Sequence, residues 1–108
     1  MRFEWDENKS RQNLLKHFIH FETAALVFDD PYMLLEQDPT GDDERWNTLG
    51  RVAPGVVLFV VHTWLEVDGE EVVRIISARA AESREREKYE EAQQGAKARH
   101  RQARRHER

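Results

Sequence analysis

The chain has 108 residues, a formal net charge of −4, 35% charged residues and no cysteine. A length near 100 residues fits one domain, and the lack of cysteine excludes a disulfide scaffold, a cysteine-ligated zinc site and a thiol nucleophile. We find neither a signal peptide pattern nor an apolar run near the roughly 20 residues of a membrane span, so we expect a cytoplasmic protein without a membrane partner.

The first third of the chain predicts a short strand and two helices. Alternation at residues 3–5 indicates the strand, and Asp6 is suited to cap a helix over residues 7–18, because its carboxylate can accept the free N–H groups of the first turn. A second apolar stripe at helical spacing predicts another helix, which Pro31 ends. This stripe consists of Phe21, Ala24, Ala25 and Phe28.

From residue 32 onward the apolar residues recur at every second position, which predicts a sheet. The stretch 56–64 is rich in β-branched and aromatic residues on both faces and is therefore expected at the centre of the sheet. Asp68-Gly69 predicts a two-residue hairpin turn of type I′. The other expected strands are residues 32–37, 45–52 and 72–79.

A two-residue turn at Asp68-Gly69 would determine the register of the last two strands. His62 then lies opposite Ile75, and the alternation of side chains decides which residues share a face. The remaining expected pairs are Val60 with Ser77 and Leu58 with Arg79. The expected faces are His62, Trp64, Ser77 and Arg79 on one side, and Arg74, Phe59, Val61 and Thr63 on the other.

The C-terminal part predicts a helix over residues 80–91 and then a basic extension. Residues 1–87 contain 10 basic and 18 acidic residues, whereas residues 88–108 contain 7 basic and 3 acidic ones. The global charge therefore hides an acidic body and a basic end. We expect one domain over residues 1–94 and an extension over residues 95–108, either helical or disordered, which holds RNA phosphates or is merely solvated.

Candidate chemistry is sparse, because the chain has neither a phosphate loop nor a His-Glu-x-x-His motif. His62 is either a general acid or base in an apolar strand or a hydrogen-bonded structural histidine. Arg79 stands where a strand leads into a helix and can grip a phosphate, although such charges also mark a solvated helix face. His17 and His20 are either ordinary polar residues or a pair of metal ligands.

The chain resembles the BrnT family of ribonuclease toxins from type II toxin–antitoxin systems. The matching pieces occur in order over residues 3–91, and the stretch Ile75–Ala80 followed by Glu85, Arg86 and Tyr89 is the most specific. The others are Phe3–Asp6, Lys9, Asn13, Lys16-His17, Phe21–Ala24, Val27–Pro31, Glu44–Trp46, Gly50, Val60–Thr63 and Arg74. Val56 departs from the pattern, since many relatives carry arginine there, and Arg51 or Arg45 is a possible substitute.

The resemblance implies an α+β fold of the RelE-like type, with two N-terminal helices packed on a small antiparallel β-sheet and a C-terminal helix. It implies a ribonuclease that acts on RNA without a cofactor. It also implies a BrnA-like ribbon-helix-helix antitoxin as partner, which neutralises the toxin and through which the complex reaches operator DNA and represses its own operon.

Metal-independent RNA cleavage needs a base for the 2′-OH, cations for the charged phosphorane and an acid for the leaving oxygen. We expect Arg79 and Arg45 to hold the phosphate, with Arg86 in support. His62, Glu85 and Tyr89 are the candidates for proton transfer. The competing hypothesis is a catalytically silent interaction module whose acidic body only binds a basic, DNA-binding antitoxin.

Overall fold

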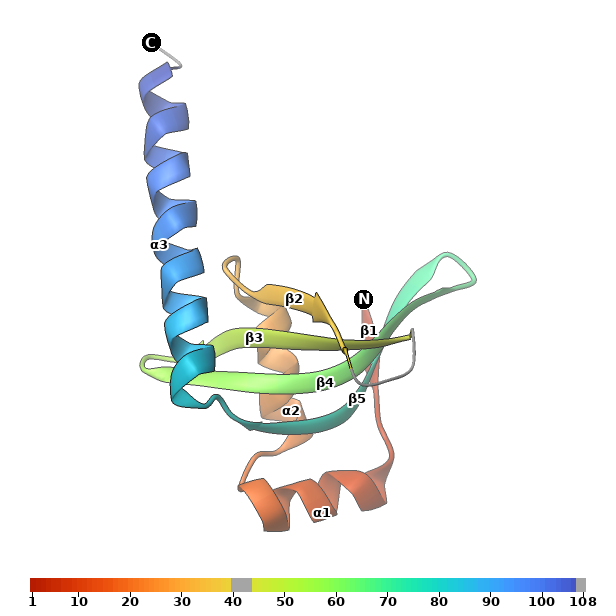
Figure 1. Ribbon diagram of the computed structural model, residues 1–108. Coiled ribbons are helices and arrows are strands. Elements are labelled where there is room, and N and C mark those ends of the chain that lie inside the picture. Colours follow the sequence, from red (N-terminus) through yellow and green to blue (C-terminus); the bar gives the residue numbers. More distant parts are fainter. Residues whose placement is uncertain (40–43, 107–108) are drawn as a thin grey trace.

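The order of elements follows the changes in hydrophobic period along the chain. The computed structural model describes residues 1–39 and 44–106, and over these residues it shows one sheet with helices on both of its faces (Figure 1). The elements are β1 (Arg2–Glu4), α1 (Glu7–His17), α2 (Phe21–Ala24), the 3-10 helix η1 (Ala25–Asp29), β2 (Leu34–Gln37), β3 (Arg45–Ala53), β4 (Val56–Val67), β5 (Glu70–Ala80) and α3 (Ser83–His106).

The two N-terminal helices begin where the sequence predicts. Asp6 caps α1, and its carboxylate accepts hydrogen bonds from the backbone N–H groups of Asn8 at 2.8 Å and Lys9 at 3.2 Å. The second predicted helix is confirmed in position but not in type, because α2 gives way to the tighter η1 after one turn. Val27, within η1, is fully buried and lies against Gly50 of β3.

The sheet has the strand order β1-β5-β4-β3-β2, so β4 lies at its centre as predicted. The expectation of an antiparallel sheet is wrong for one strand, because β1 pairs with β5 in parallel. A parallel pair needs a long connection between its strands, and here the whole intervening chain provides it. The α+β class is confirmed, and the sheet is mixed.

The turn between β4 and β5 has the predicted form. Asp68 and Gly69 both have positive φ, at 52° and 81°, as a type I′ turn requires. From this turn the predicted register holds as far as the pair His62–Ile75.

Beyond that pair, a β-bulge shifts the register by one residue. Val61 pairs with Ser77 and Phe59 pairs with Arg79, so Ile76 is the extra residue on β5. The predicted partners of Val60 and Leu58 are therefore wrong. Because side chains alternate along a strand, the extra residue moves Ser77 and Arg79 to the face opposite to His62.

The two faces of the sheet pack against different elements. The helix face packs against α2 and η1 and forms the main core, in which Phe21, Ala24 and Val27 are fully buried. A Cβ atom on Gly50 would lie 2.7 Å from Cβ of Val27, so this packing requires glycine. We call the other side the open face, and it carries Phe59, Val61, Thr63, Ser77 and Arg79, all half-buried.

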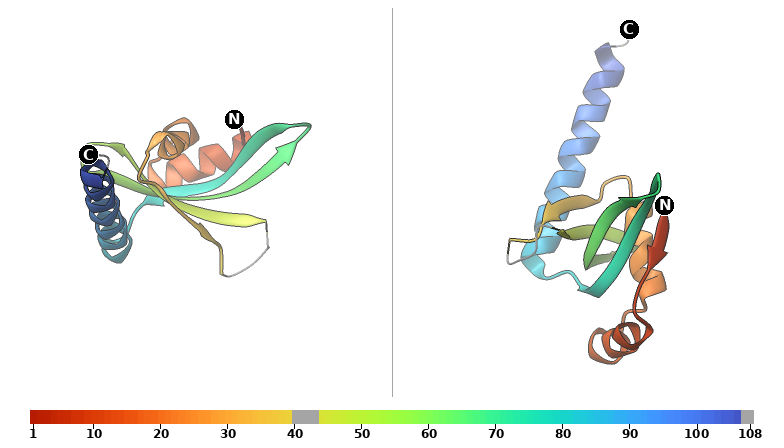
Figure 2. Two further views of the ribbon diagram at one scale, coloured as in Figure 1. Left: turned by 90° about the horizontal axis from the view of Figure 1, so that it is seen from above. Right: turned by 90° about the vertical axis from the view of Figure 1, so that its right-hand side faces the viewer.

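The helix α3 crosses one end of the open face and then projects beyond the sheet (Figures 1 and 2). Its first turns bury Tyr89 against Leu49 and Val57. The helix predicted to end at residue 91 continues through Gly95 to His106, so α3 includes most of the basic extension. No helix in the described part of the chain is long and apolar enough to cross a membrane.

Asn13 joins α1 to the free edge of β5. Its carboxamide accepts a hydrogen bond from the Ala78 N–H at 3.0 Å and donates to the Ala78 carbonyl at 2.9 Å and the Ile19 carbonyl at 3.0 Å. Because β1 pairs with β5 only up to Arg74, the amide side chain replaces a missing strand at Ala78.

Replacing Asn13 with alanine should lower the free energy of unfolding by about 2–4 kcal/mol, because two buried backbone groups of Ala78 lose their partners. Urea unfolding followed by circular dichroism measures this. Asn8→Ala, an exposed change on the same helix, should stay within about 0.5 kcal/mol of the parent. Equal effects of the two substitutions would contradict the role assigned to Asn13.

Candidate functional site

The junction between β5 and α3 brings together an arginine and a carboxylate. Arg79 donates two hydrogen bonds to Glu85, Nη1 to Oε1 at 2.7 Å and Nη2 to Oε2 at 3.0 Å. Oε1 also accepts from the backbone N–H of Glu82 at 2.8 Å, which places Glu85 within the first turn of α3. The bidentate contact therefore holds both side chains in one geometry.

The pair lies at a boundary between protein and solvent. The Arg79 guanidinium lies over the Phe59 ring, with 4.2 Å between Cζ and the ring centre, while 30% of the Arg79 side chain remains exposed. The hydrogen bond between the two side chains raises the pKa of Arg79 and lowers the pKa of Glu85. Both groups are charged at neutral pH, and the arginine is stacked, oriented and accessible.

The other two predicted phosphate ligands lie elsewhere. Arg45 is exposed at the start of β3, on the same face as Arg79 but four residues away in register, which is about 13 Å along the strands. Arg86 donates from Nη1 to the Gly55 carbonyl at 3.0 Å, so it contacts the β3–β4 turn. The structure therefore does not gather the three arginines around one point.

His62 lies in the core on the helix face, fully buried. Its Nδ1 donates to the Thr63 carbonyl at 3.1 Å, so the neutral ring accepts through Nε2 from the Thr48 hydroxyl at 2.7 Å. Burial lowers the pKa of His62 to about 4. The predicted shared face with Arg79 is wrong, and the geometry is that of the structural alternative.

Tyr89 is also fully buried and belongs to a separate polar cluster. Its hydroxyl donates to Oδ2 of Asp30 at 2.5 Å, and the same oxygen accepts from the Arg51 backbone N–H at 2.8 Å. Burial, with the Asp30 carboxylate second, raises the pKa of Tyr89 far above its usual value. This phenol ties α3 to the segment after η1.

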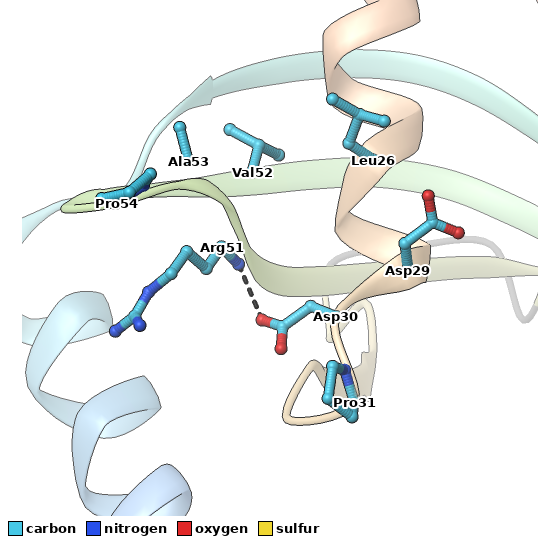
Figure 3. A pocket seen from close by; sticks show the side chains of 8 residues that line it. All are labelled: Leu26, Asp29, Asp30, Pro31, Arg51, Val52, Ala53 and Pro54. Atoms are coloured by element: carbon cyan, nitrogen blue, oxygen red, sulfur yellow. Dashed lines mark hydrogen bonds between the residues drawn. The ribbon is translucent and has the colours of Figure 1, made fainter.

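An open pocket of about 430 Å³ lies beside this cluster, between η1 and the end of β3 (Figure 3). Its walls are mostly apolar, and Asp29 and Asp30 contribute carboxylates. Arg51 also lines the pocket, and in Figure 3 its side chain extends toward α3, so the lining contains two carboxylates and one guanidinium. The negative charge of the pocket disfavours a phosphate ligand.

Sequence reasoning missed three residues that organise these sites. Asp30 precedes the Pro31 that ends the second predicted helix, and an aspartate before proline favours a turn. For Phe59 and Thr48, the sequence indicates only that they lie in strands, and nothing in it predicts their contacts with Arg79 and His62. No cluster of three metal-ligating side chains occurs among the described residues, so His17 and His20 gain no third ligand there.

Comparisons with known proteins connect this chain to one family. The family profile described as "Ribonuclease toxin, BrnT, of type II toxin-antitoxin system" matches residues 5–85. The crystal structure of the Brucella abortus ribonuclease toxin BrnT is similar in fold, with a TM-score of 0.58 and 21% identity, over 77% of this chain and 99% of the other. No curated protein matches the chain.

The depressed pKa of His62 predicts a loss of stability in acid. The unfolded chain binds a proton on this histidine below its ordinary pKa of 6.5, whereas the folded chain binds it only near pH 4. Between these values the unfolded state holds more protons, so stability falls as the pH falls, by about 3 kcal/mol in total.

Urea unfolding between pH 7.5 and 4 tests this for the parent chain and His62→Gln. The stability difference between them should shrink by about 3 kcal/mol toward low pH. The exposed His20→Gln is the control and should follow the parent. A difference that does not change with pH would show that His62 is not a buried neutral group.

Proposed function

This chain belongs to the family of BrnT ribonuclease toxins of type II toxin–antitoxin systems, and we propose that it cleaves RNA at the Arg79–Glu85 pair. The observation that supports this site is the half-exposed guanidinium, oriented by Glu85 and stacked on Phe59. Arginine suits a phosphodiester because its planar fork of donors matches two phosphate oxygens.

The proposed reaction is a metal-independent phosphodiester transfer within the RNA. The 2′-oxygen attacks the phosphorus, the bond to the 5′-oxygen breaks, and a cyclic phosphate remains. Arg79 stabilises the negative charge that develops on the phosphorane, where a fixed donor has its largest effect. Arg45 contacts a phosphate farther along the strand, and Arg86 supports the site through the β3–β4 turn.

Glu85 is the base in this proposal. Its depressed pKa keeps it ionised at neutral pH, so it can accept the proton of the 2′-OH. Because His62 and Tyr89 are both enclosed, we assign them structural roles, and water supplies the proton for the 5′-oxygen.

We also propose the regulation that is typical of such systems. A BrnA-like ribbon-helix-helix antitoxin binds and neutralises the chain, and the complex represses its own operon. The acidic body, with 18 acidic and 10 basic residues over residues 1–87, supports a basic partner. Contact with operator DNA is then made by the antitoxin.

A second candidate function is a catalytically silent module that only binds the antitoxin. The burial of His62 and Tyr89 favours it, since two of the three predicted proton-transfer groups cannot meet RNA in this conformation. The acidic pocket beside Asp29 also has the chemistry to receive a basic partner. A purified chain that binds the antitoxin but leaves RNA intact would establish this alternative.

Replacing Arg79 with alanine should reduce the rate of RNA cleavage by about 10²–10³-fold, because one charge-stabilising donor is lost from the transition state. Cleavage of purified RNA and growth arrest on induction of the chain alone are the two measurements. Arg79→Lys should recover only part of the rate, since an ammonium cannot form the bidentate contact.

Arg74→Ala is the matched control. Arg74 lies on the same strand and face, and its ion pair with Glu4 is exposed. It should retain cleavage and arrest, and circular dichroism should show that all variants are folded. Unchanged cleavage by folded Arg79→Ala would exclude the proposed site.

A further inference from the structure

A second pocket, a groove, lies at the edge of the sheet between α1 and β5. It has a volume of about 260 Å³ and is separate from the Arg79–Glu85 pair. Most of its wall comes from one side of α1, and the remainder comes from the bulged part of β5. Its lining residues are Lys9, Gln12, Asn13, Lys16, His17, Ile76 and Ser77.

The groove follows from two features of the fold. The bulge at Ile76 interrupts the regular edge of β5 just beyond the end of β1. Asn13 then holds α1 against that edge through its three hydrogen bonds. Lys9 and Lys16 lie four residues before and three residues after Asn13, so they share its side of the helix.

The chemistry of the groove is that of an anion site. Two ammonium groups, a histidine, two side-chain amides and the Ser77 hydroxyl line it, and its described lining contains no carboxylate. Lys9 helps to lower the pKa of the Asp6 carboxyl, but the main cause is that this carboxylate accepts hydrogen bonds from the backbone N–H groups of Lys9 and Asn8. Lysine is a common point-charge ligand of phosphate.

The β5 strand contributes residues both to the groove and to the proposed cleavage site. Ser77 and Arg79 are two residues apart on β5 and project on the same side, a separation of about 7 Å. We propose that the groove binds the backbone phosphates of the RNA substrate next to the phosphate held by Arg79. This subsite rests on the proposed ribonuclease function. In this proposal the bound RNA strand runs along the protein surface from α1 past Ser77 to Arg79.

RNA is favoured over an acidic protein segment by the arrangement of the donors. They continue along β5 into a guanidinium oriented for a phosphodiester, so one extended polyanion can engage both places. An acidic peptide would gain nothing from the continuity with Arg79. The contribution of the groove is electrostatic and independent of base sequence, because all of its donors are suited to phosphate oxygens.

The test uses the full chain with Lys9→Gln and Lys16→Gln together. The probe is a short single-stranded RNA with 2′-O-methyl groups, which lacks the attacking hydroxyl, and binding is followed by fluorescence anisotropy over a series of salt concentrations. The slope of log affinity against log salt should decrease in magnitude by about 1.4, because two phosphate contacts are lost. With cleavable RNA, KM should rise while kcat changes little.

The control variant is Arg2→Gln with Arg11→Gln, which removes the same charge from exposed positions outside the groove. It should leave the salt slope close to that of the parent. A parent that cleaves RNA, together with equal slopes for the two double variants, would overturn the groove while leaving the cleavage site intact. A parent that neither binds nor cleaves RNA would overturn the proposed function and the groove with it.

An oligoglutamate peptide with the same charge as the RNA probe tests the alternative occupant, an acidic protein segment. The parent should bind it more weakly than the RNA, and the lysine substitutions should change this binding less. Equal binding of both probes, or an effect of the substitutions on the peptide alone, would assign the groove to an acidic partner segment and overturn the RNA subsite.

Discussion

The β-bulge at Ile76 is the constraint on which the rest of the structure depends. A regular strand would place residues 75, 77 and 79 on one face, but the extra residue allows Ile75 and Ala78 to be buried in the same core. It also turns Ser77 and Arg79 outward, where Arg79 meets Phe59 and Glu85. One inserted residue thus serves both the core and the candidate site, and bulges are common near functional positions.

The early end of β1 explains why α1 packs where it does. Beyond the end of β1, the edge of β5 has backbone groups without a strand partner, and Asn13 supplies the missing donor and acceptor at Ala78. A buried N–H or carbonyl left unpaired would cost about 1–3 kcal/mol. The same contact presents Lys9 and Lys16 beside Ser77. The same side of α1 therefore stabilises the fold through Asn13 and gives the groove its positive charge through Lys9 and Lys16.

The candidate site was only partly predictable from the sequence. The sequence indicates Arg79 as a phosphate ligand, because it stands where a strand leads into a helix, and Glu85 as one of three candidates for proton transfer. That the two side chains pair with each other is seen only in the structure. His62 and Tyr89 were equally attractive by residue type, yet both are enclosed, with the pKa of His62 lowered to about 4 and that of Tyr89 raised. The residue type shows whether a side chain can accept or donate a proton, whereas its burial and hydrogen-bond partners decide its pKa and whether it can contact a substrate. Arg45 shares the face, but distances across three strands are invisible in a sequence.

The sequence by itself determined the family, the order of the elements, the Asp6 cap, the central position of β4 and the turn at Asp68-Gly69, because each is encoded by neighbouring residues. Only the tertiary structure decided the parallel pairing of β1, the change to a 3-10 helix at Ala25 and the face of Arg79. The physical reason is that local patterns repeat with a fixed period, whereas a bulge depends on packing on both sides of the strand. The formal net charge of −4 does not indicate the function, because recognition depends on how the charged side chains are distributed over the folded surface.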